Sequence, residues 1–442
     1  MLRFNENNEV ISKETYRAIL VGVQSSEDIT YSMEELAGLA EAAEAEVLGV
    51  MTQNLIRPNR ATYIGKGKVL ELAEMCEHME ADTVIFNNEL SGVQLRNLEE
   101  QLKVKVVDRT ILILDIFASR AVSGEGKLQV ELAQLQYRLP RLIGFGKALS
   151  RLGGGIGTRG PGEKKLETDR RHIAKRMDDI KAEILKLRSS RNTQRAKREK
   201  SDIPIVALVG YTNSGKSAMM NKLLEQTGGE DKVVFEENML FATLDTSQRR
   251  IKLENNNEFI LIDTVGFVSK LPHSLVSAFK STLEEVNYAD LLLHVVDSSY
   301  ENCDFHIEVT DKVLGEIGAG DKEKVLVFNK VDLLSDFTSN ESTATDTLQD
   351  SIAVLAGSAR ESVAVSAKTG YGIDDLVGKI AAKIFGDRVR VKFMIPYEKG
   401  DVASYLYEKA EVFIMEYTPD GTFMDVRVAK ADYSRLKQYE QE

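Results

Sequence analysis

The sequence predicts a multidomain α/β protein, and three observations lead to that prediction. The chain has 442 residues, which at about 150 residues per domain is enough for roughly three domains. Residues 1–122 alternate apolar, strand-like runs with amphipathic, helix-like runs, and a strand after Pro204 leads directly into a glycine-containing loop and a helix. Apolar residues make up 43% and charged residues 29%, which argues against a disordered, collagen-like or coiled-coil chain.

The N-terminal part, residues 1–122, is predicted to form a parallel α/β domain. Two capping boxes support the expected helix starts, one pairing Ser32 with Glu35 and the other pairing Ser91 with Gln94. The expected segments, in chain order, are a strand at 16–23, a helix at 32–46, a strand at 47–53, a helix at 68–75, a strand at 81–88, a helix at 91–102 and a strand at 104–108.

Residues 123–200 are predicted to form an antiparallel helical hairpin. The first apolar stripe consists of Leu128, Leu132, Leu135 and Leu139. A second apolar stripe, with coiled-coil spacing, runs through residues 166–187 and would pack on the first. Residues 143–162, between the stripes, contain eight glycines and are expected to form a loop. The polar, basic stretch 189–202 is expected to be a hinge into the next domain.

The hairpin concentrates positive charge in a chain that is acidic as a whole. The whole chain has a net charge of −12, whereas residues 138–200 hold 19 Lys or Arg against 7 Asp or Glu. Glycine permits close backbone approach and Lys or Arg contacts phosphate, so the loop is predicted to bind folded RNA. A flexible linker and a solvated basic helix face are the alternatives. The predicted RNA-binding residues are Lys147, Arg151, Arg159, Lys164 and Lys165.

The loop that follows the strand after Pro204 has the pattern of a P-loop. Its backbone amides would wrap phosphates at a helix start, Lys216 would reach the β- and γ-phosphates, and the Ser217 hydroxyl would ligate Mg²⁺. The predicted phosphate-binding residues are Gly210, Tyr211, Thr212, Asn213, Ser214, Gly215, Lys216 and Ser217. We therefore expect a central nucleotide-binding domain over residues 201–387.

Three downstream motifs indicate a guanine nucleotide. The strand FILIDTVGF ends in Asp263, which would hold Mg²⁺ directly or through water, and in Gly266, whose amide would sense the γ-phosphate. The strand KVLVF leads to Asp332, whose carboxylate would accept N1–H and the 2-amino group of guanine. The strand SVAVSAK would close the base pocket. The predicted residues of these motifs are Asp263, Thr264, Val265, Gly266, Asn329, Lys330, Val331, Asp332, Ser366, Ala367 and Lys368.

A first switch is expected between the P-loop and Asp263. Its residues would be Phe241, Ala242, Thr243, Leu244 and Asp245. Thr243 would complete the Mg²⁺ shell, and an ordinary loop threonine is the alternative. The predicted metal ligands are Ser217, Thr243 and Asp263, and the predicted catalytic residues are Lys216, Ser217, Thr243 and Gly266.

The residue after Gly266 bears on the rate of hydrolysis. Phe267 stands where Ras-like GTPases carry a glutamine that orients the attacking water. We therefore expect slow intrinsic GTP hydrolysis, on the order of 10⁻³ s⁻¹ or less, with acceleration by a partner.

Taken together, these motifs resemble those of the HflX-type ribosome-associated GTPases, in the Obg-HflX group. The resemblance rests on FATLD and DTVGF, on the block at 107–142 and on GGGIGTRGPGEKKLETDRR at 153–171. Thr246 departs from an expected proline, and Lys164-Lys165 from a frequent Thr-Gln. The resemblance implies binding to the large ribosomal subunit, with the hairpin loop reaching toward the peptidyl transferase region, and dissociation of stalled or stressed ribosomes.

The remaining observations concern the C-terminus, the cysteines and the location. Residues 388–442 are predicted to form a small α+β domain with two strands around a Pro-Asp-Gly turn. Cys76 and Cys303 are expected to be buried thiols, and because each has only one nearby histidine, zinc is not predicted. Neither a membrane-spanning run nor a signal peptide is found, so a cytoplasmic, partly ribosome-associated protein is expected.

Three functions remain open at this point. The leading hypothesis is a Mg²⁺-dependent GTP hydrolase, monomeric when free, that binds the large ribosomal subunit and dissociates ribosomes. The second is a subunit assembly factor that uses GTP only as an affinity switch. The third is a GTPase for a protein or membrane partner, and in that case neutralising the basic loop would leave partner binding intact.

Overall fold

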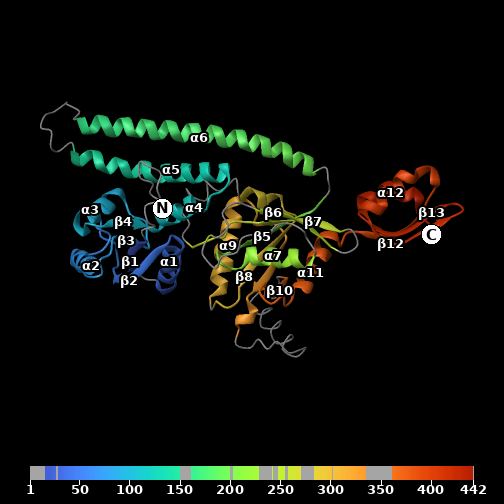
Figure 1. The fold of residues 1–442 in the computed structure, drawn as a ribbon, viewed down its shortest axis with the longest axis horizontal. Coiled ribbons are helices and arrows are strands. Elements are labelled where there is room, and N and C mark those ends of the chain that lie inside the picture. Colours follow the sequence, from blue (N-terminus) through green and yellow to red (C-terminus); the bar gives the residue numbers. More distant parts are fainter. Residues whose placement is uncertain are drawn as a thin grey trace. The chain divides into compact units, whose positions relative to one another are not determined.

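The structure, a computed structural model, describes residues 15–25, 28–149, 161–199, 203–227, 241, 247–253, 257–269, 283–300, 302–334 and 361–441. These residues form three β-sheets with helices packed on them and a pair of long helices (Figure 1). The predicted multidomain α/β class is confirmed. No helix in these residues is long and apolar enough to cross a membrane.

The N-terminal sheet is fully parallel and has the strand order β2-β1-β3-β4. Its strands are β1 (Tyr16–Gln24), β2 (Ala45–Asn54), β3 (Thr83–Phe86) and β4 (Lys105–Asp108), and its helices are α1 (Thr30–Ala42), α2 (Lys66–His78), α3 (Gly92–Leu102) and α4 (Arg109–Arg120). Buried residues of α2 and α3 form one apolar core with the sheet. The alternation predicted from the sequence is confirmed, except that α4 was not predicted.

One of the two predicted capping boxes is present and the other is not. Ser91 accepts the Gln94 backbone N–H, and the Gln94 side chain accepts the Ser91 backbone N–H. By contrast, α1 begins at Thr30, before Ser32, and the Thr30 N–H is accepted by Asp28 Oδ1 at 3.0 Å. Ser32 and Glu35 are instead buried in the body of the helix, so the prediction that they cap it was wrong.

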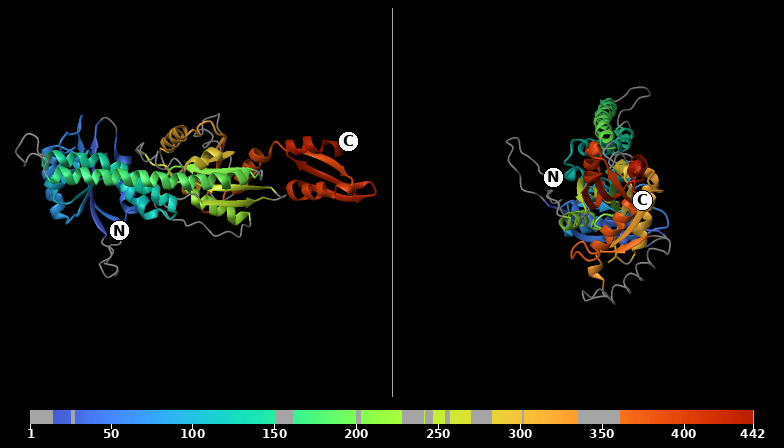
Figure 2. Two further views of the ribbon diagram at one scale, coloured as in Figure 1. Left: turned by 90° about the horizontal axis from the view of Figure 1, so that it is seen from above. Right: turned by 90° about the vertical axis from the view of Figure 1, so that its right-hand side faces the viewer.

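The helical hairpin consists of α5 (Gly124–Leu149) and α6 (Pro161–Glu199), which lie side by side in Figures 1 and 2. Leu132 packs against Ile180 and Ile184, and Arg176 forms an ion pair with Glu131 at 2.8 Å. Two sequence expectations were wrong. The expected loop is partly helical, since α5 continues to Leu149, and the expected hinge at 189–202 is helical through Glu199.

The hairpin is anchored to the N-terminal sheet through α5. The Tyr137 hydroxyl donates a 2.6 Å hydrogen bond to Asp108, which is fully buried at the end of β4. Arg141 donates to the Leu90 carbonyl oxygen at 3.0 Å, and the α5 backbone at Arg141 approaches Gly92 so closely that a Cβ there would lie 2.7 Å from the Arg141 carbonyl oxygen. The glycine at the start of α3 therefore permits the close approach of α5.

The central sheet has the strand order β10-β9-β8-β5-β7-β6, with only β6 antiparallel to its neighbour. Its elements are β5 (Ile205–Gly210), α7 (Lys216–Gln226), β6 (Ser247–Lys252), β7 (Glu258–Asp263), η3 (Glu284–Tyr288), β8 (Leu291–Asp297), α9 (Cys303–Ile317), β9 (Lys324–Asn329), η4 (Val331–Leu333), β10 (Ser362–Ala364) and α11 (Ile373–Phe385). Helices α7 and α11 share one apolar core with the sheet, and α9 packs into another. The parallel strands bring their carboxyl ends to one edge.

The C-terminal sheet is antiparallel, with the order β11-β13-β12. Its elements are β11 (Val389–Ile395), η5 (Tyr397–Lys399), α12 (Gly400–Lys409), β12 (Glu411–Thr418), β13 (Gly421–Val428), α13 (Lys430–Leu436) and η6 (Lys437–Tyr439). The predicted strand pair around the Pro-Asp-Gly turn is β12 and β13.

The chain divides into two compact units that do not follow the sequence order. The first contains residues 1–195 together with 237–245 and 268–282, and the second contains 196–236, 246–267 and 283–442. Two segments from the central part of the sequence therefore belong to the N-terminal unit. The bounds of the four predicted domains remain predictions.

Candidate nucleotide-binding site

The loop between β5 and α7 depends on two glycines with backbone conformations that L side chains avoid. Gly210 has φ +150°, and a Cβ there would lie 2.2 Å from the Val295 carbonyl oxygen. Gly215 has φ +92°, and a Cβ there would lie 2.2 Å from Asn329 Nδ2. The glycines of the motif are thus required by close backbone and side-chain approach.

Lys216 begins α7 and is buried in this loop. Its ammonium donates to the carbonyl oxygens of Gly210, at 3.2 Å, and Tyr211, at 2.8 Å. Burial lowers its pKa to about 8, although Asp263 opposes the shift. An added phosphate would favour the charged form, so this lysine is suited to bind an anion.

Ser217 and Asp263 lie side by side, as a Mg²⁺ site requires. The Ser217 hydroxyl donates to Asp263 Oδ2 at 2.7 Å, and Asp263 is fully buried at the end of β7. Next to it, Thr264 donates to the Leu208 carbonyl oxygen at 2.6 Å, which fixes the end of the strand. A hydroxyl and a carboxylate are hard oxygen ligands of the type Mg²⁺ prefers, with phosphate and water completing its shell. The two residues therefore fit the predicted ion.

The segment after β7 lies against the P-loop. Phe267 donates its backbone N–H to the Gly210 carbonyl oxygen at 3.1 Å, and its own carbonyl oxygen accepts the Thr212 N–H at 2.6 Å. A Cβ on Gly266 would lie 2.7 Å from Thr212 Cα and 3.0 Å from Lys216 Nζ. The segment after β7 therefore packs closely against the P-loop.

The predicted base-recognition motifs meet at the other end of the P-loop. Asn329 donates to the Ser214 carbonyl oxygen at 2.9 Å and accepts the Ala367 N–H at 3.0 Å, so it joins the P-loop to the loop after β10. The Ser366 hydroxyl donates to Asp332 Oδ1 at 2.6 Å, which orients that carboxylate.

The two lysines of the base motifs do not take part in these hydrogen bonds. Lys330 pairs with Asp297 at 2.7 Å, and Lys368 is exposed.

The histidine near Cys303, His306, packs between aromatic rings. His306 stacks on Tyr211 of the P-loop, with ring centroids 4.0 Å apart, and on Tyr300 at 4.6 Å. Cys76 and Cys303 are buried free thiols. Within the described residues, no group of three or more His, Cys, Asp or Glu could hold a metal ion.

Some predicted site residues fall outside this arrangement. Among the first-switch residues only Phe241 is described, and Ala242, Thr243, Leu244 and Asp245 lie outside the described residues. Arg151 and Arg159 also lie outside them. Lys147 falls in α5 and not in the loop that the sequence predicted, whereas Lys164 and Lys165, which follow the predicted loop, fall in α6.

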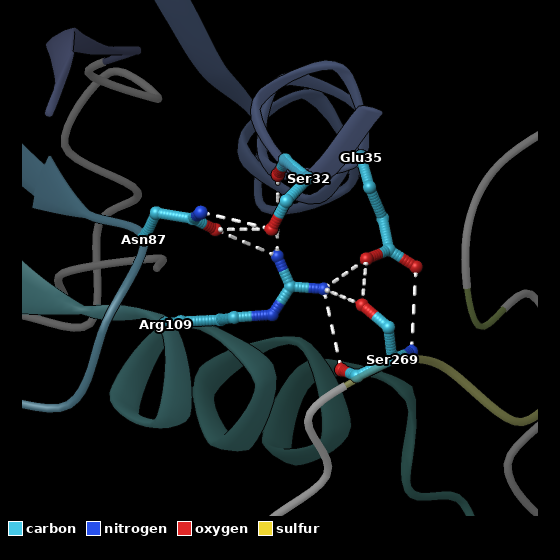
Figure 3. Close-up of polar contacts among 5 residues, drawn as sticks. All are labelled: Ser32, Glu35, Asn87, Arg109 and Ser269. Carbon is cyan, nitrogen blue, oxygen red and sulfur yellow. Dashed lines mark hydrogen bonds and ion pairs between the residues drawn. The ribbon is translucent and has the colours of Figure 1, made fainter. Parts of the chain in front are cut away.

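A second polar site, which we call the Arg109 cluster, was not predicted from the sequence. Its members are Ser32, Glu35, Asn87, Arg109 and Ser269, and all are buried (Figure 3). Arg109 directly follows β4, where Asp108 caps α4 by accepting the Ile111 N–H at 2.9 Å. The only local signal was an arginine in an apolar helix start. Ser269 is 160 residues away in sequence, so its approach could not be predicted.

Four family models match the chain. They match residues 30–118, 120–198, 205–330 and 351–439. In that order they are described as GTP-binding GTPase N-terminal, GTP-binding GTPase middle region, 50S ribosome-binding GTPase and HflX C-terminal domain.

Full-length relatives agree with these matches. The chain is 48% identical over 431 residues to GTPase HflX of Caldanaerobacter subterraneus subsp. tengcongensis, covering 98% of this chain and 95% of the relative. It is 38% identical to GTPase HflX of Escherichia coli K12, covering 95% of each. A solved GTP-binding protein from Sulfolobus solfataricus in complex with GDP is 26% identical, with a TM-score of 0.43, and covers 83% of this chain and 98% of that one. Because it is 48% and 38% identical to these two GTPase HflX relatives over nearly its whole length, the chain belongs to the HflX family of GTP-binding GTPases.

Proposed function

We propose that this GTPase is a Mg²⁺-dependent switch that binds the large ribosomal subunit through its basic hairpin and dissociates stalled or stressed ribosomes. The observation that carries the proposal is the match of residues 205–330 to a family described as a 50S ribosome-binding GTPase. The charge of the hairpin supports it. In α6, residues 167–187 hold 6 basic and 5 acidic side chains, whereas residues 188–199 hold 5 basic and 1 acidic, so most of the excess positive charge is at the C-terminal end of the helix. Such a segment suits phosphate contacts.

The site geometry supports a division of roles. Lys216 and the P-loop amides would hold the β- and γ-phosphates, Ser217 and Asp263 would hold Mg²⁺, and the Asp332 carboxylate would accept the guanine donors. Bound Mg²⁺ would neutralise charge that develops on the transferred phosphoryl group.

Intrinsic hydrolysis is expected to be slow. Phe267 is 1% exposed and apolar, so its side chain cannot orient a water molecule. The lysine and the backbone amides would supply the remaining stabilisation, and a partner would supply what Phe267 lacks. Ribosomal subunits are the proposed partner.

The test is GTP turnover by the full chain, with and without purified large ribosomal subunits. One variant replaces Arg151, Arg159, Lys164 and Lys165 by alanine. A control of equal charge change replaces four exposed lysines elsewhere, namely Lys103, Lys312, Lys399 and Lys437. Strong stimulation that is lost only in the first variant supports the proposal. Absence of stimulation of the wild type contradicts it.

Dissociation and assembly roles are separated by a second measurement. Assembled ribosomes are sedimented after incubation with the protein and GTP. Conversion to subunits supports a dissociating role, whereas subunit binding without conversion supports the alternative, an assembly factor that uses GTP as an affinity switch.

A further inference from the structure

The P-loop contains one buried aromatic side chain, that of Tyr211. This residue is 3% exposed, although it lies in the loop between β5 and α7. Its ring stacks on His306 of α9, with ring centroids 4.0 Å apart and an angle of 13° between the ring planes. His306 in turn stacks on Tyr300, at 4.6 Å and 12°. We call these three nearly parallel rings the aromatic stack, and His306 is the member that joins the other two.

The main chain of Tyr211 helps to hold the phosphate-binding lysine. The Tyr211 carbonyl oxygen accepts Lys216 Nζ at 2.8 Å and the Ser214 N–H at 3.3 Å. The Gly210 carbonyl oxygen also accepts Lys216 Nζ, at 3.2 Å. Because a buried ammonium group needs acceptors, the position of these two carbonyl oxygens determines where the ammonium group of Lys216 lies. Gly210 has no side chain that could anchor this backbone, whereas Tyr211 has a buried ring.

The other members of the stack lie on elements that are themselves held in place. Ser298, two residues before Tyr300, donates both its backbone N–H and its hydroxyl to the Asn329 carbonyl oxygen, at 2.9 and 2.6 Å. His306 is 7% exposed and lies four residues before fully buried Thr310, on the buried face of α9. All these residues and the P-loop belong to the second compact unit. The stack therefore anchors the P-loop within a single unit.

The place where the stack ends distinguishes it from an ordinary core contact. Stacked aromatic rings stabilise a domain beyond the area that they bury. A stack between two helices would contribute to stability alone. This one ends on the residue whose carbonyl oxygen accepts Lys216, so a displacement of the Tyr211 ring displaces that acceptor as well.

We propose that His306 is a positioning residue of the nucleotide site, which stacks on Tyr211 and so keeps Lys216 in place for the β-phosphate of a guanine nucleotide. The stack lowers the dissociation constant of nucleotides that carry a β-phosphate and has little effect on GMP, which lacks one. This inference rests on the role proposed above for Lys216 and not on ribosome binding, because its test contains no ribosomes.

The test compares GDP with GMP in variants of the full chain. Dissociation constants are measured with Mg²⁺ by competition against a fluorescent GDP derivative. His306→Ala removes the central ring, and His306→Phe keeps a ring without its nitrogens. The matched control is Val313→Ala, which also truncates a buried side chain of α9, seven residues further along the helix. Thermal midpoints are recorded for each variant, so that a loss of stability is seen separately from a change in nucleotide preference.

We expect His306→Ala to bind GDP about tenfold more weakly than the wild type, the factor for the loss of aromatic stacking, and to bind GMP within about twofold. His306→Phe should bind GDP within about threefold of the wild type, because its ring can still stack. Val313→Ala should lower the thermal midpoint and keep the wild-type ratio of the two dissociation constants. A ratio within twofold of the wild type for His306→Ala, or GDP binding by His306→Phe as weak as by His306→Ala, would overturn the proposal.

Lys216→Ala separates this inference from the role on which it rests. This variant should also lose the preference for GDP over GMP, since it lacks the group that reaches the β-phosphate. If Lys216→Ala loses the preference and His306→Ala keeps it, the inference about His306 is wrong and the role of Lys216 stands. If Lys216→Ala keeps the preference, the role of Lys216 is wrong and the inference is wrong with it.

Discussion

Replacing Asn329 by alanine tests whether the base pocket and the P-loop form one binding unit. The Asn329 side chain is 2% exposed and bonds to Ser214 of the P-loop and to Ala367 of the loop after β10. The alanine variant leaves a buried carbonyl oxygen and a buried N–H without the partner they have in the wild type. Gly215 then no longer faces an amide, and the two loops are no longer joined through this side chain.

The magnitude follows from the two bonds. Each hydrogen bond contributes a net stabilisation of about 1 to 1.5 kcal/mol, so the variant loses about 2 to 3 kcal/mol of the free energy that orders the two loops. If that ordering is recovered only when nucleotide binds, the GDP dissociation constant rises by about 30- to 150-fold. The assay is equilibrium titration with a fluorescent GDP derivative in the presence of Mg²⁺.

The matched control is Asn287→Ala in the same compact unit. Asn287 donates to the Ile317 carbonyl oxygen at 2.9 Å and joins η3 to the end of α9, away from the P-loop. This control should lower the thermal midpoint yet keep GDP affinity within about twofold. GDP binding by Asn329→Ala within fivefold of the wild type would refute the reasoning, since the two loops would then be ordered without this residue.

Three further predictions concern stability, thiol reactivity and the metal. Tyr137→Phe should lower the free energy of unfolding of the N-terminal unit by about 1 to 3 kcal/mol, because buried Asp108 loses a 2.6 Å donor; an unchanged urea midpoint would contradict this. Burial raises the pKa of Cys76 to about 11, so the thiol stays neutral below that pH. Its alkylation in the native protein should rise about tenfold per pH unit from pH 8 to 10, and a flat profile would be inconsistent with burial. Removing Mg²⁺ with EDTA should abolish GTP hydrolysis, and Ser217→Ala should need at least about tenfold more Mg²⁺ for half-maximal rate, because Asp263 would remain as ligand without its hydroxyl neighbour.

Local sequence patterns predicted the structure correctly where residues close together in the sequence determine the geometry. The P-loop was predicted because its glycines, lysine and serine are contiguous and its backbone conformation depends on them. Ser91 and Gln94 were predicted correctly for the same reason, since a capping box involves only one turn of helix. The joining of Ser214 to Asn329 across 115 residues was not itself predicted, although both motifs were.

Predictions from glycine content and charge were wrong at two places in the hairpin. Isolated glycines cost a helix only about 1 kcal/mol each, so Gly144 and Gly146 do not end α5. The stretch after Ser189 is rich in Arg, Lys, Gln and Ala, which are strong helix formers, and α6 continues to Glu199. Polar composition indicates solvent exposure and does not by itself predict a hinge.

The failure of the capping prediction at Ser32 and Glu35 has a different cause. Their spacing satisfies a capping box, but a buried guanidinium from α4 competes for the carboxylate and the helix starts two residues earlier. Because a buried charge must be paired, Arg109 determines the use of Glu35 more strongly than the local cap does. The same pair also engages Ser269. Where a well-formed local signal is overridden by a distant residue, the tertiary contact decides the outcome, and here that contact is the buried pair of Arg109 and Glu35.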